Sequence, residues 1–530
     1  MEERYLGEIL EGDLESGFTA KIYPTVREES IELGQFIVIE GEKYLYLTLI
    51  NNISLAAVNS TIIDALTSNV FLNDEDKEII IKATKGKLLY QQLSLKPLIC
   101  VNRLDNCVEK VKTVPKHLAK IRRATQEDIN LIFGEKNERN LPIGFPLGMD
   151  FELNINIEKL LMRNTGIFAI AGSGKSFLAK ILAGHIIASG LGVVLVFDMH
   201  NEYGWLSESE EGISVKGLKG IFPEDVVLAT LDPETSPRYD IAIQLSLEDI
   251  EPADILACAE EMNLSEPMID AVFNFAKKFR KSWLKELLET ETDTLEKTTK
   301  IMRSTIQALK RRLNARIHRF KFINETTAER KTFETLINML KDGKSIILEF
   351  GRYETDVSAY ILVANAIARR IHREYVRATR EGWREELKPL MIFIEEAHKF
   401  LGPKVARFSI FNTIAREMRK YMVTLCIVDQ RPSQIHDEVL SQIWTRFILA
   451  LMDEDDIKAA LSGITEVREM KTIVPSLRRQ EALVFGYALP SPAVFRVINY
   501  DDKLFDFWKK IRKPLVSSYE DEPERLFEDD

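Results

Sequence analysis

The segment AIAGSGKS at positions 169–176 constrains this chain more than any other feature. It follows an apolar run, GIFAIA, and precedes an amphipathic stretch, FLAKILAGHIIASG, which together indicate a strand, a loop and a helix. Glycines let backbone N–H groups turn toward phosphate oxygens, and the following helix adds its positive end. We therefore expect ATP and Mg²⁺ here, with Lys175 at the β- and γ-phosphates and the Ser176 hydroxyl at Mg²⁺. The expected loop residues are Gly172, Ser173, Gly174, Lys175 and Ser176.

Two points qualify this motif. Ala169 occupies the position of the first glycine in the pattern GxxxxGK[ST], where its methyl group could reshape the entrance of the loop. A Gly-rich turn between a strand and a helix can also have a purely structural role, without binding a nucleotide. The surrounding sequence is needed to choose between these interpretations.

Short apolar runs alternate with helical segments from about position 160 onward. The runs are GIFAIA, GVVLVFD, SIILEF, LMIFIEE, MVTLCIVD and RFILALM. Runs that are apolar on both faces are typical of a parallel sheet covered by helices on both sides. The sequence therefore predicts an α/β domain with a mostly parallel sheet.

Changes in composition divide the chain into four parts. Residues 1–105 consist of short β-rich pieces separated by turn residues, which predicts a small β-barrel. Residues 106–145 form a linker with a basic, helical stretch, PKHLAKIRRATQEDINLIF. The α/β core is expected over 146–500, with a helical insertion at about 250–340. Residues 501–530 are expected to form a carboxy-terminal arm with an acidic tail.

Bulk properties place the chain among ordinary globular proteins. No stretch approaches the roughly 18 apolar residues of a membrane span, and the first residues lack the layout of a secretory signal, so we expect a cytoplasmic protein without a membrane partner. Four scattered cysteines without CxxC spacing argue against a zinc ribbon or a disulfide framework. The net charge of -11 does not exclude a locally basic channel for nucleic acid.

Two adjacent carboxylates end the apolar run in LMIFIEEAH. The carboxyl ends of strands are where α/β sheets place their chemistry. We expect Glu395 to orient Mg²⁺ through water and Glu396 to polarise the attacking water as general base. An acidic first turn of the following helix would explain the same two residues.

The order of five motifs resembles one family. AGSGKS, VFDMHNEYG, IEEAHKFL, IAREMRKY and DQRPSQI occur in the sequence order of the HerA group of HerA/FtsK-type ATPases. The β-rich start resembles the HAS barrel of that group, and FGYALPSPAVFRV is similar to its last core strand. The resemblance implies RecA-like P-loop cores in a homo-hexamer, an ATP-driven translocase or helicase that encircles double-stranded DNA. It also implies a NurA-like nuclease or other effector on the barrel side, acting in DNA end resection and double-strand break repair.

The resemblance also implies roles near the γ-phosphate. Asp198 and Glu202 in DMHNEYG are candidates, although Glu202 could equally cap a turn. Gln430 resembles a polar sensor of the γ-phosphate, the alternative being a satisfied loop amide. His398 is expected to hydrogen-bond behind the site, because no second spaced His supports a zinc site.

Three arginines are candidates for contacts across a subunit interface. Arg419 in AREMRKY is the first choice for an arginine finger, and Arg416, three residues earlier on the same helical face, is the second. Arg163 precedes the P-loop strand and is a further candidate for binding the nucleotide at the interface. Each of the three could instead be an ordinary solvated arginine.

A dense basic cluster lies in the expected insertion. Its charges suit salt-sensitive, sequence-independent binding to DNA phosphates, but they could also face solvent or a neighbouring subunit. Its members are Lys310, Arg311, Arg312, Arg316, Arg319 and Lys321.

Two rival functions stay open at this level. Related motor families serve secretion and conjugation, although this chain shows no membrane segment of its own. A ring-forming ATPase could also act as a scaffold for an effector enzyme in antiviral defence, without productive hydrolysis.

Overall fold

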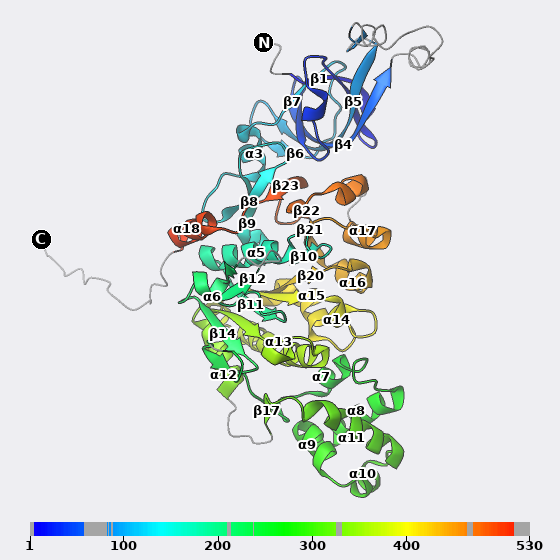
Figure 1. Cartoon of the computed structure of the whole chain (residues 1–530), viewed down its shortest axis with the longest axis vertical. Helices are drawn as coiled ribbons and strands as arrows, with labels where there is room; N and C mark the ends of the chain where they lie inside the picture. Colours follow the sequence, from blue (N-terminus) through cyan, green and yellow to red (C-terminus); the bar gives the residue numbers. More distant parts are fainter. Residues whose placement is uncertain are drawn as a thin grey trace, which may run out of the picture.

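The amino-terminal strands close into a small antiparallel barrel at one end of the molecule (Figure 1). The computed structural model describes residues 5–57, 82, 84–85, 88–208, 214–236, 238–324, 331–463 and 470–512. Within them, six strands pair in the order β2-β1-β7-β3-β4-β5, and β5 returns to β2. These strands are β1 (Gly7–Asp13), β2 (Gly17–Ile22), β3 (Phe36–Glu40), β4 (Tyr44–Ala57), β5 (Leu89–Asn102) and β7 (Lys120–Arg123). The prediction of a small barrel is confirmed.

The strand β7 was not expected, because it falls within the basic stretch that we predicted to be helical. Ile121 points into the barrel core, and the buried Arg122 guanidinium bonds Glu40 at 2.8 Å and Asp128 at 2.7 Å. A helix begins only after Thr125, whose hydroxyl accepts the N–H of Asp128 and so caps α3 (Gln126–Phe133). Pairing with β1 and β3 therefore overrides the helical pattern of residues 120–123.

A twelve-stranded mixed sheet forms the centre of the described molecule. Its order is β15-β14-β18-β11-β19-β20-β10-β21-β22-β23-β8-β9. The strands from β15 to β21 run parallel, and β22, β23, β8 and β9 continue the sheet antiparallel. The predicted α/β fold with a mostly parallel sheet is confirmed. The parallel strands are β15 (Ile241–Ala242), β14 (Val226–Thr230), β18 (Ser345–Glu349), β11 (Val193–Asp198), β19 (Leu390–Glu395), β20 (Val423–Asp429), β10 (Asn164–Phe168) and β21 (Ile443–Ile448).

The antiparallel strands join the central sheet to the barrel. They are β22 (Glu481–Gly486), β23 (Ala493–Val497), β8 (Asn140–Pro146) and β9 (Leu153–Asn156). The Phe36 ring of the barrel lies 5.9 Å from that of Phe133 on α3, and both belong to the hydrophobic core of the central domain. The barrel therefore shares a core with the sheet. A Cβ on Gly34 would meet Val494 of β23 at 3.0 Å, so the two layers approach closely.

Helices pack against the central sheet. The helix α5 (Lys175–Ser189) contacts β10, β11 and α18 (Asp502–Ile511). The long α13 (Val357–Glu381) packs on α12 (Lys331–Lys341) and on α15 (Ile410–Tyr421), which itself lies on β20. The acidic tail that we expected at the end of the chain lies outside the described residues.

A helical lobe lies at the end of the molecule opposite the barrel (Figure 1). It contains α8 (Glu266–Phe279), α9 (Trp283–Glu289), α10 (Thr292–Thr299) and α11 (Arg303–Ile317), which contact one another. The preceding helix α7 (Pro252–Ala257) packs on α13, and α12 contacts β18. Both ends of the segment expected as an insertion are thus anchored on the central domain.

The described residues contain no helix with the length and hydrophobicity of a bilayer-spanning segment. Cys100, Cys258 and Cys426 are buried and Cys107 is exposed, and all four are free thiols.

A buried histidine ties α18 to the P-loop helix. The Trp508 indole N–H donates to Nδ1 of His185 at 2.8 Å, and Nε2 of His185 donates to the Pro142 carbonyl at 2.9 Å. Both ring nitrogens are used by the neutral imidazole. The indole also packs against Gly184, where a Cβ would lie 2.4 Å from the ring, so only glycine permits this approach.

The stability of this contact should depend on pH. Burial lowers the pKa of His185 from 6.5 to about 4. Between these pH values the unfolded chain therefore binds a proton at His185 and the folded protein does not. The contribution of neutral His185 to the free energy of unfolding is fully present above pH 6.5. It decreases by about 3 kcal/mol at most as the pH falls toward 4. Thermal denaturation between pH 7 and pH 4.5 measures this effect. We expect His185→Gln, which can still accept from Trp508, to lose less stability than the parent over that range; parallel losses would contradict the assignment.

Candidate nucleotide site

The P-loop joins β10 to α5 with the backbone that its glycines predict. Gly172 has a φ of 76° and Gly174 a φ of 104°, in the left-handed region that favours glycine. Ala169 has an ordinary negative φ, is fully buried, and donates its N–H to the Asp429 carbonyl at 3.1 Å. The missing first glycine therefore leaves the turn intact, because this position needs no left-handed backbone. Lys175 and Ser176 begin the helix.

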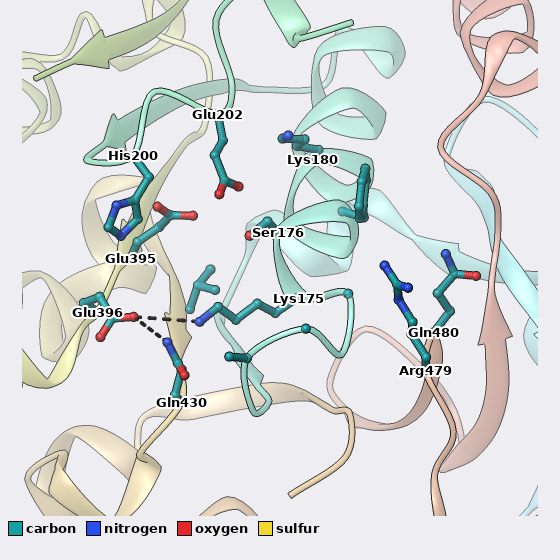
Figure 2. Close-up of a pocket in the computed structure, with 15 residues that line it drawn as sticks. Lys175, Ser176, Lys180, His200, Glu202, Glu395, Glu396, Gln430, Arg479 and Gln480 are labelled. Atoms are coloured by element: carbon teal, nitrogen blue, oxygen red, sulfur yellow. Dashed lines mark hydrogen bonds and ion pairs between the residues drawn. The ribbon is translucent and has the colours of Figure 1, made fainter. Parts of the chain in front are cut away.

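The order of the parallel strands brings the acidic motifs to this loop. β11, β19, β20 and β10 are consecutive neighbours, so their carboxyl ends meet at one edge of the sheet. A cavity of about 250 Å³ opens there (Figure 2). Its lining is Ala171, Gly172, Gly174, Lys175, Ser176, Phe177, Lys180, His200, Glu202, Glu395, Glu396, Val428, Gln430, Arg479 and Gln480.

Glu396 lies across the cavity from the P-loop lysine. Its Oε1 is 3.8 Å from Lys175 Nζ and accepts a hydrogen bond from Gln430 Nε2 at 3.0 Å (Figure 2). The backbone of Glu396 has a φ of 48°, which costs a residue with a side chain about 1–2 kcal/mol. Such strain persists where the surrounding structure enforces it, often at functional sites. Here it accompanies a carboxylate directed at Lys175.

Glu395 is buried behind Glu396. Its Oε1 accepts the Tyr203 hydroxyl at 3.1 Å, and its Oε2 has no hydrogen-bond partner among the described residues. Burial, followed by the charges of Asp198 and Glu202, raises the pKa of Glu395 to about 8. A buried carboxylate with one unsatisfied oxygen beside a P-loop serine fits a hydrated Mg²⁺, whose charge and water ligands would satisfy it.

Asp198 lies beneath the cavity and does not line it. Its Oδ1 accepts the N–H of Glu202 and its Oδ2 that of Tyr203, both at 2.8 Å, which folds the chain back after β11. Burial raises the pKa of Asp198 to about 6. The side chain of Glu202 instead reaches the cavity. Of these two candidates, Glu202 lines the cavity and Asp198 positions the loop that carries it.

Two of the three candidate arginines, Arg163 and Arg416, do not line the cavity of their own chain. The Arg163 guanidinium lies over the rings of Trp444, at 4.7 Å, and Tyr487, at 5.3 Å. These residues stand at the sheet edge opposite the P-loop, since Arg163 directly precedes β10. Arg416 is half-exposed and pairs with Glu438. Arg419 belongs to α15, but its side chain lies outside the described part of the structure. Their roles across an interface stay predictions.

His398 supports the site from behind, as predicted. Its ring Nδ1 lies 3.0 Å from Oδ2 of the buried Asp429, and its backbone N–H donates to the same oxygen at 2.7 Å. The other oxygen of Asp429 accepts the N–H of Arg431 at 2.7 Å. This aspartate therefore ties together the loops that carry Glu396 and Gln430.

Four of the six residues of the basic cluster contact other residues of the same chain. Lys310 donates to the Thr290 carbonyl at 2.6 Å, and Lys321 pairs with Glu234 at 3.0 Å. Arg312 contacts Met268 and Arg316 contacts the Glu261 carbonyl. Arg311 and Arg319 are exposed. Lys310, Arg312 and Arg316 thus contact segments in or next to the helical lobe, whereas Lys321 pairs with the loop after β14.

Sequence reasoning missed several cavity residues. Lys180 follows Ser176 by one helical turn, a spacing that could have indicated a shared face. It is buried, and burial lowers its pKa despite the nearby carboxylates. Arg479 and Gln480 come from the segment before β22, some 300 residues away, and no local pattern marks them. Phe177, His200 and Val428 also belong to this group.

Comparison with known proteins agrees with the motifs. A family model described as the central domain of helicase HerA matches residues 141–371. The chain is 25% identical to the DNA double-strand break repair helicase HerA of Sulfolobus acidocaldarius over 498 residues, covering 90% of this chain and 91% of the relative. The chain is therefore similar to HerA helicases over about nine tenths of its length.

Further relatives extend the same comparison. The chain is also 25% identical over 517 residues to the protein of the same name from Sulfurisphaera tokodaii, covering 92% of this chain and 94% of the relative. Among solved structures, VirB4 of Thermoanaerobacter pseudethanolicus matches with 12% identity and a TM-score of 0.46, over 69% of this chain and 98% of that one. A likeness at that TM-score is too weak to indicate a shared function.

Proposed function

We propose that this chain is the subunit of a homo-hexameric ring that hydrolyses ATP to move along double-stranded DNA. The observation that carries this proposal is the meeting of Lys175, Ser176, Glu396 and Gln430 around one cavity, in a chain that is similar to HerA helicases. HerA relatives are named as helicases of double-strand break repair, which supports DNA as the substrate track. A NurA-like nuclease is the partner that we propose for end resection, and the barrel is its proposed docking site.

Each residue of the cavity has a role in this proposal. The P-loop N–H groups and Lys175 hold the triphosphate, and Glu396 orients and polarises the attacking water. Gln430 positions the Glu396 carboxylate through its 3.0 Å hydrogen bond and lies where it can contact the γ-phosphate. The 3.8 Å pair between Lys175 and Glu396 would open as phosphate takes the place of the carboxylate beside the ammonium group. ATP binding would thereby release Glu396 toward water.

Ser176 and Glu395 are the residues that would hold Mg²⁺, the serine directly and the glutamate through water. Bound there, the ion would neutralise charge on the β- and γ-phosphates. Glu395 is suited to this task because its second oxygen is buried and has no partner among the described atoms. Tyr203 keeps the carboxylate oriented through the first oxygen.

We further propose that a neighbouring subunit completes the site with an arginine. Arg419 is the preferred finger, Arg416 the second choice, and Arg163 an additional interfacial cation. The aromatic rings of Trp444 and Tyr487 would restrict the Arg163 side chain to one direction.

DNA should stimulate ATP turnover by the purified protein, and that stimulation should weaken steeply between about 50 and about 200 mM salt, because phosphate contacts release counterions. A steady-state ATPase assay with and without linear duplex DNA measures this effect, and native mass spectrometry measures the size of the ring. Lys175→Ala serves as the control without nucleotide binding. If DNA does not change the rate of ATP turnover, either with or without the nuclease, the scaffold function would be favoured.

A further inference from the structure

The nucleotide cavity has two chemically different ends. Glu396 and Gln430 stand at one end, and Arg479 and Gln480 at the other, with Lys175 and the P-loop between them (Figure 2). The first end carries the proposed hydrolytic residues and therefore faces the γ-phosphate. A triphosphate that lies along the P-loop must then carry its nucleoside toward the second end.

The second end is attached to the phosphate loop itself. The Gln480 N–H donates to the Ser173 carbonyl at 3.1 Å, and the Gln480 carbonyl accepts the Val497 N–H at 2.8 Å. A Cβ on Gly174 would lie 3.7 Å from Gln480 Cγ, so the two segments are within van der Waals reach. Gln480 also has a φ of 65°, a left-handed conformation that these two bonds hold in place. The position of this wall is therefore coupled to that of the P-loop.

The side chains of this wall suit a nucleoside. A guanidinium is planar, stacks on aromatic faces and donates several hydrogen bonds. A glutamine amide both donates and accepts, which matches the edge of a base or the hydroxyls of a ribose. Both side chains are exposed at the mouth of the cavity, where a base would leave the phosphate loop.

We propose that Arg479 and Gln480 contact the nucleoside of bound ATP and contribute to nucleotide affinity through it. The inference rests on the proposed function, because it presumes ATP in this cavity. It extends that function by assigning a nucleoside subsite to a segment that lies more than 300 residues beyond the P-loop in sequence.

The adjacent Arg478 provides a matched control. Its guanidinium points to the barrel, where it lies 3.3 Å from Glu32, and its side chain is 71% exposed. It does not line the cavity. Replacing Arg478 therefore removes an arginine from the same segment without touching the nucleoside end.

The test compares two ligands by isothermal titration calorimetry in the presence of Mg²⁺. One is the non-hydrolysable β,γ-imido analogue of ATP, and the other is inorganic tripolyphosphate, which lacks a nucleoside. We expect Arg479→Ala to weaken binding of the analogue by about tenfold and to leave tripolyphosphate binding within about twofold. Gln480→Gly, which removes the amide while tolerating the positive φ, should show a smaller loss in the same direction. Arg478→Ala should leave both affinities unchanged.

Three results would overturn the proposal. Equal weakening of both ligands by Arg479→Ala would make Arg479 a phosphate ligand, and no weakening of either would mean that Arg479 contacts neither ligand. Tripolyphosphate binding as tight as that of the analogue in the parent protein would mean that no nucleoside contact contributes. Failure of the proposed function is distinguishable, because the parent protein would then bind neither ligand and Lys175→Ala would change nothing.

Discussion

The Glu396→Gln variant should bind ATP as tightly as the parent and hydrolyse it about 10²- to 10⁴-fold more slowly, the range that a general base contributes. The introduced amide can still accept the Gln430 hydrogen bond, so the local structure should persist. It cannot accept a proton from water. The measurement is a steady-state ATPase assay together with calorimetric titration of ATP.

Controls separate this chemical effect from binding and from folding. Lys175→Ala should lose affinity as well as turnover, because its ammonium group contacts the phosphates. Glu385→Gln changes an exposed carboxylate in the short 3-10 helix before β19 and should keep parent activity. Near-parental turnover by Glu396→Gln would show that another group acts as the base.

Arg419→Ala should reduce ATP turnover by about 10³-fold or more if the side chain acts as an arginine finger. Mixed rings test whether it acts across the interface. Subunits with Lys175→Ala cannot bind ATP but still present Arg419 to a neighbour, so mixing them with Arg419→Ala subunits should restore part of the activity. The restored turnover should peak at intermediate mixing ratios.

The matched control is the double variant Lys175→Ala, Arg419→Ala, which can supply neither function and should restore nothing. Parallel mixing of Arg416→Ala subunits identifies which arginine of α15 is the finger. Equal inactivity of Arg419→Ala at every ratio would count against a role in trans.

The sequence alone predicted the features that depend on local spacing. The P-loop was identifiable because a strand, a glycine-containing turn and a helix are specified by residues 160–190. Glu395 and Glu396 were identifiable because the carboxyl ends of parallel strands share one edge of a sheet, and Gln430 was a candidate through the resemblance to HerA. The order of motifs predicted a resemblance to HerA proteins, and the comparisons confirm that resemblance.

Other features required the tertiary structure. Whether Asp198 or Glu202 faces the cavity depends on two backbone hydrogen bonds that no sequence pattern displays. The basic cluster suggested DNA binding, yet Lys310 and Lys321 have partners in the folded chain. Residues 120–123 became a strand because the barrel closes through them.

The two ends of the cavity illustrate most clearly the difference between what the sequence predicts and what the tertiary structure decides. Lys175 and its P-loop are encoded by consecutive residues, so the sequence alone determined that a phosphate-binding loop is present. Arg479 and Gln480 reach the same cavity because β22 lies beside β21, which lies beside β10. That strand order results from packing of the whole sheet, since contacts between distant segments form only when the core is assembled. The tertiary structure alone therefore decided what stands at the nucleoside end.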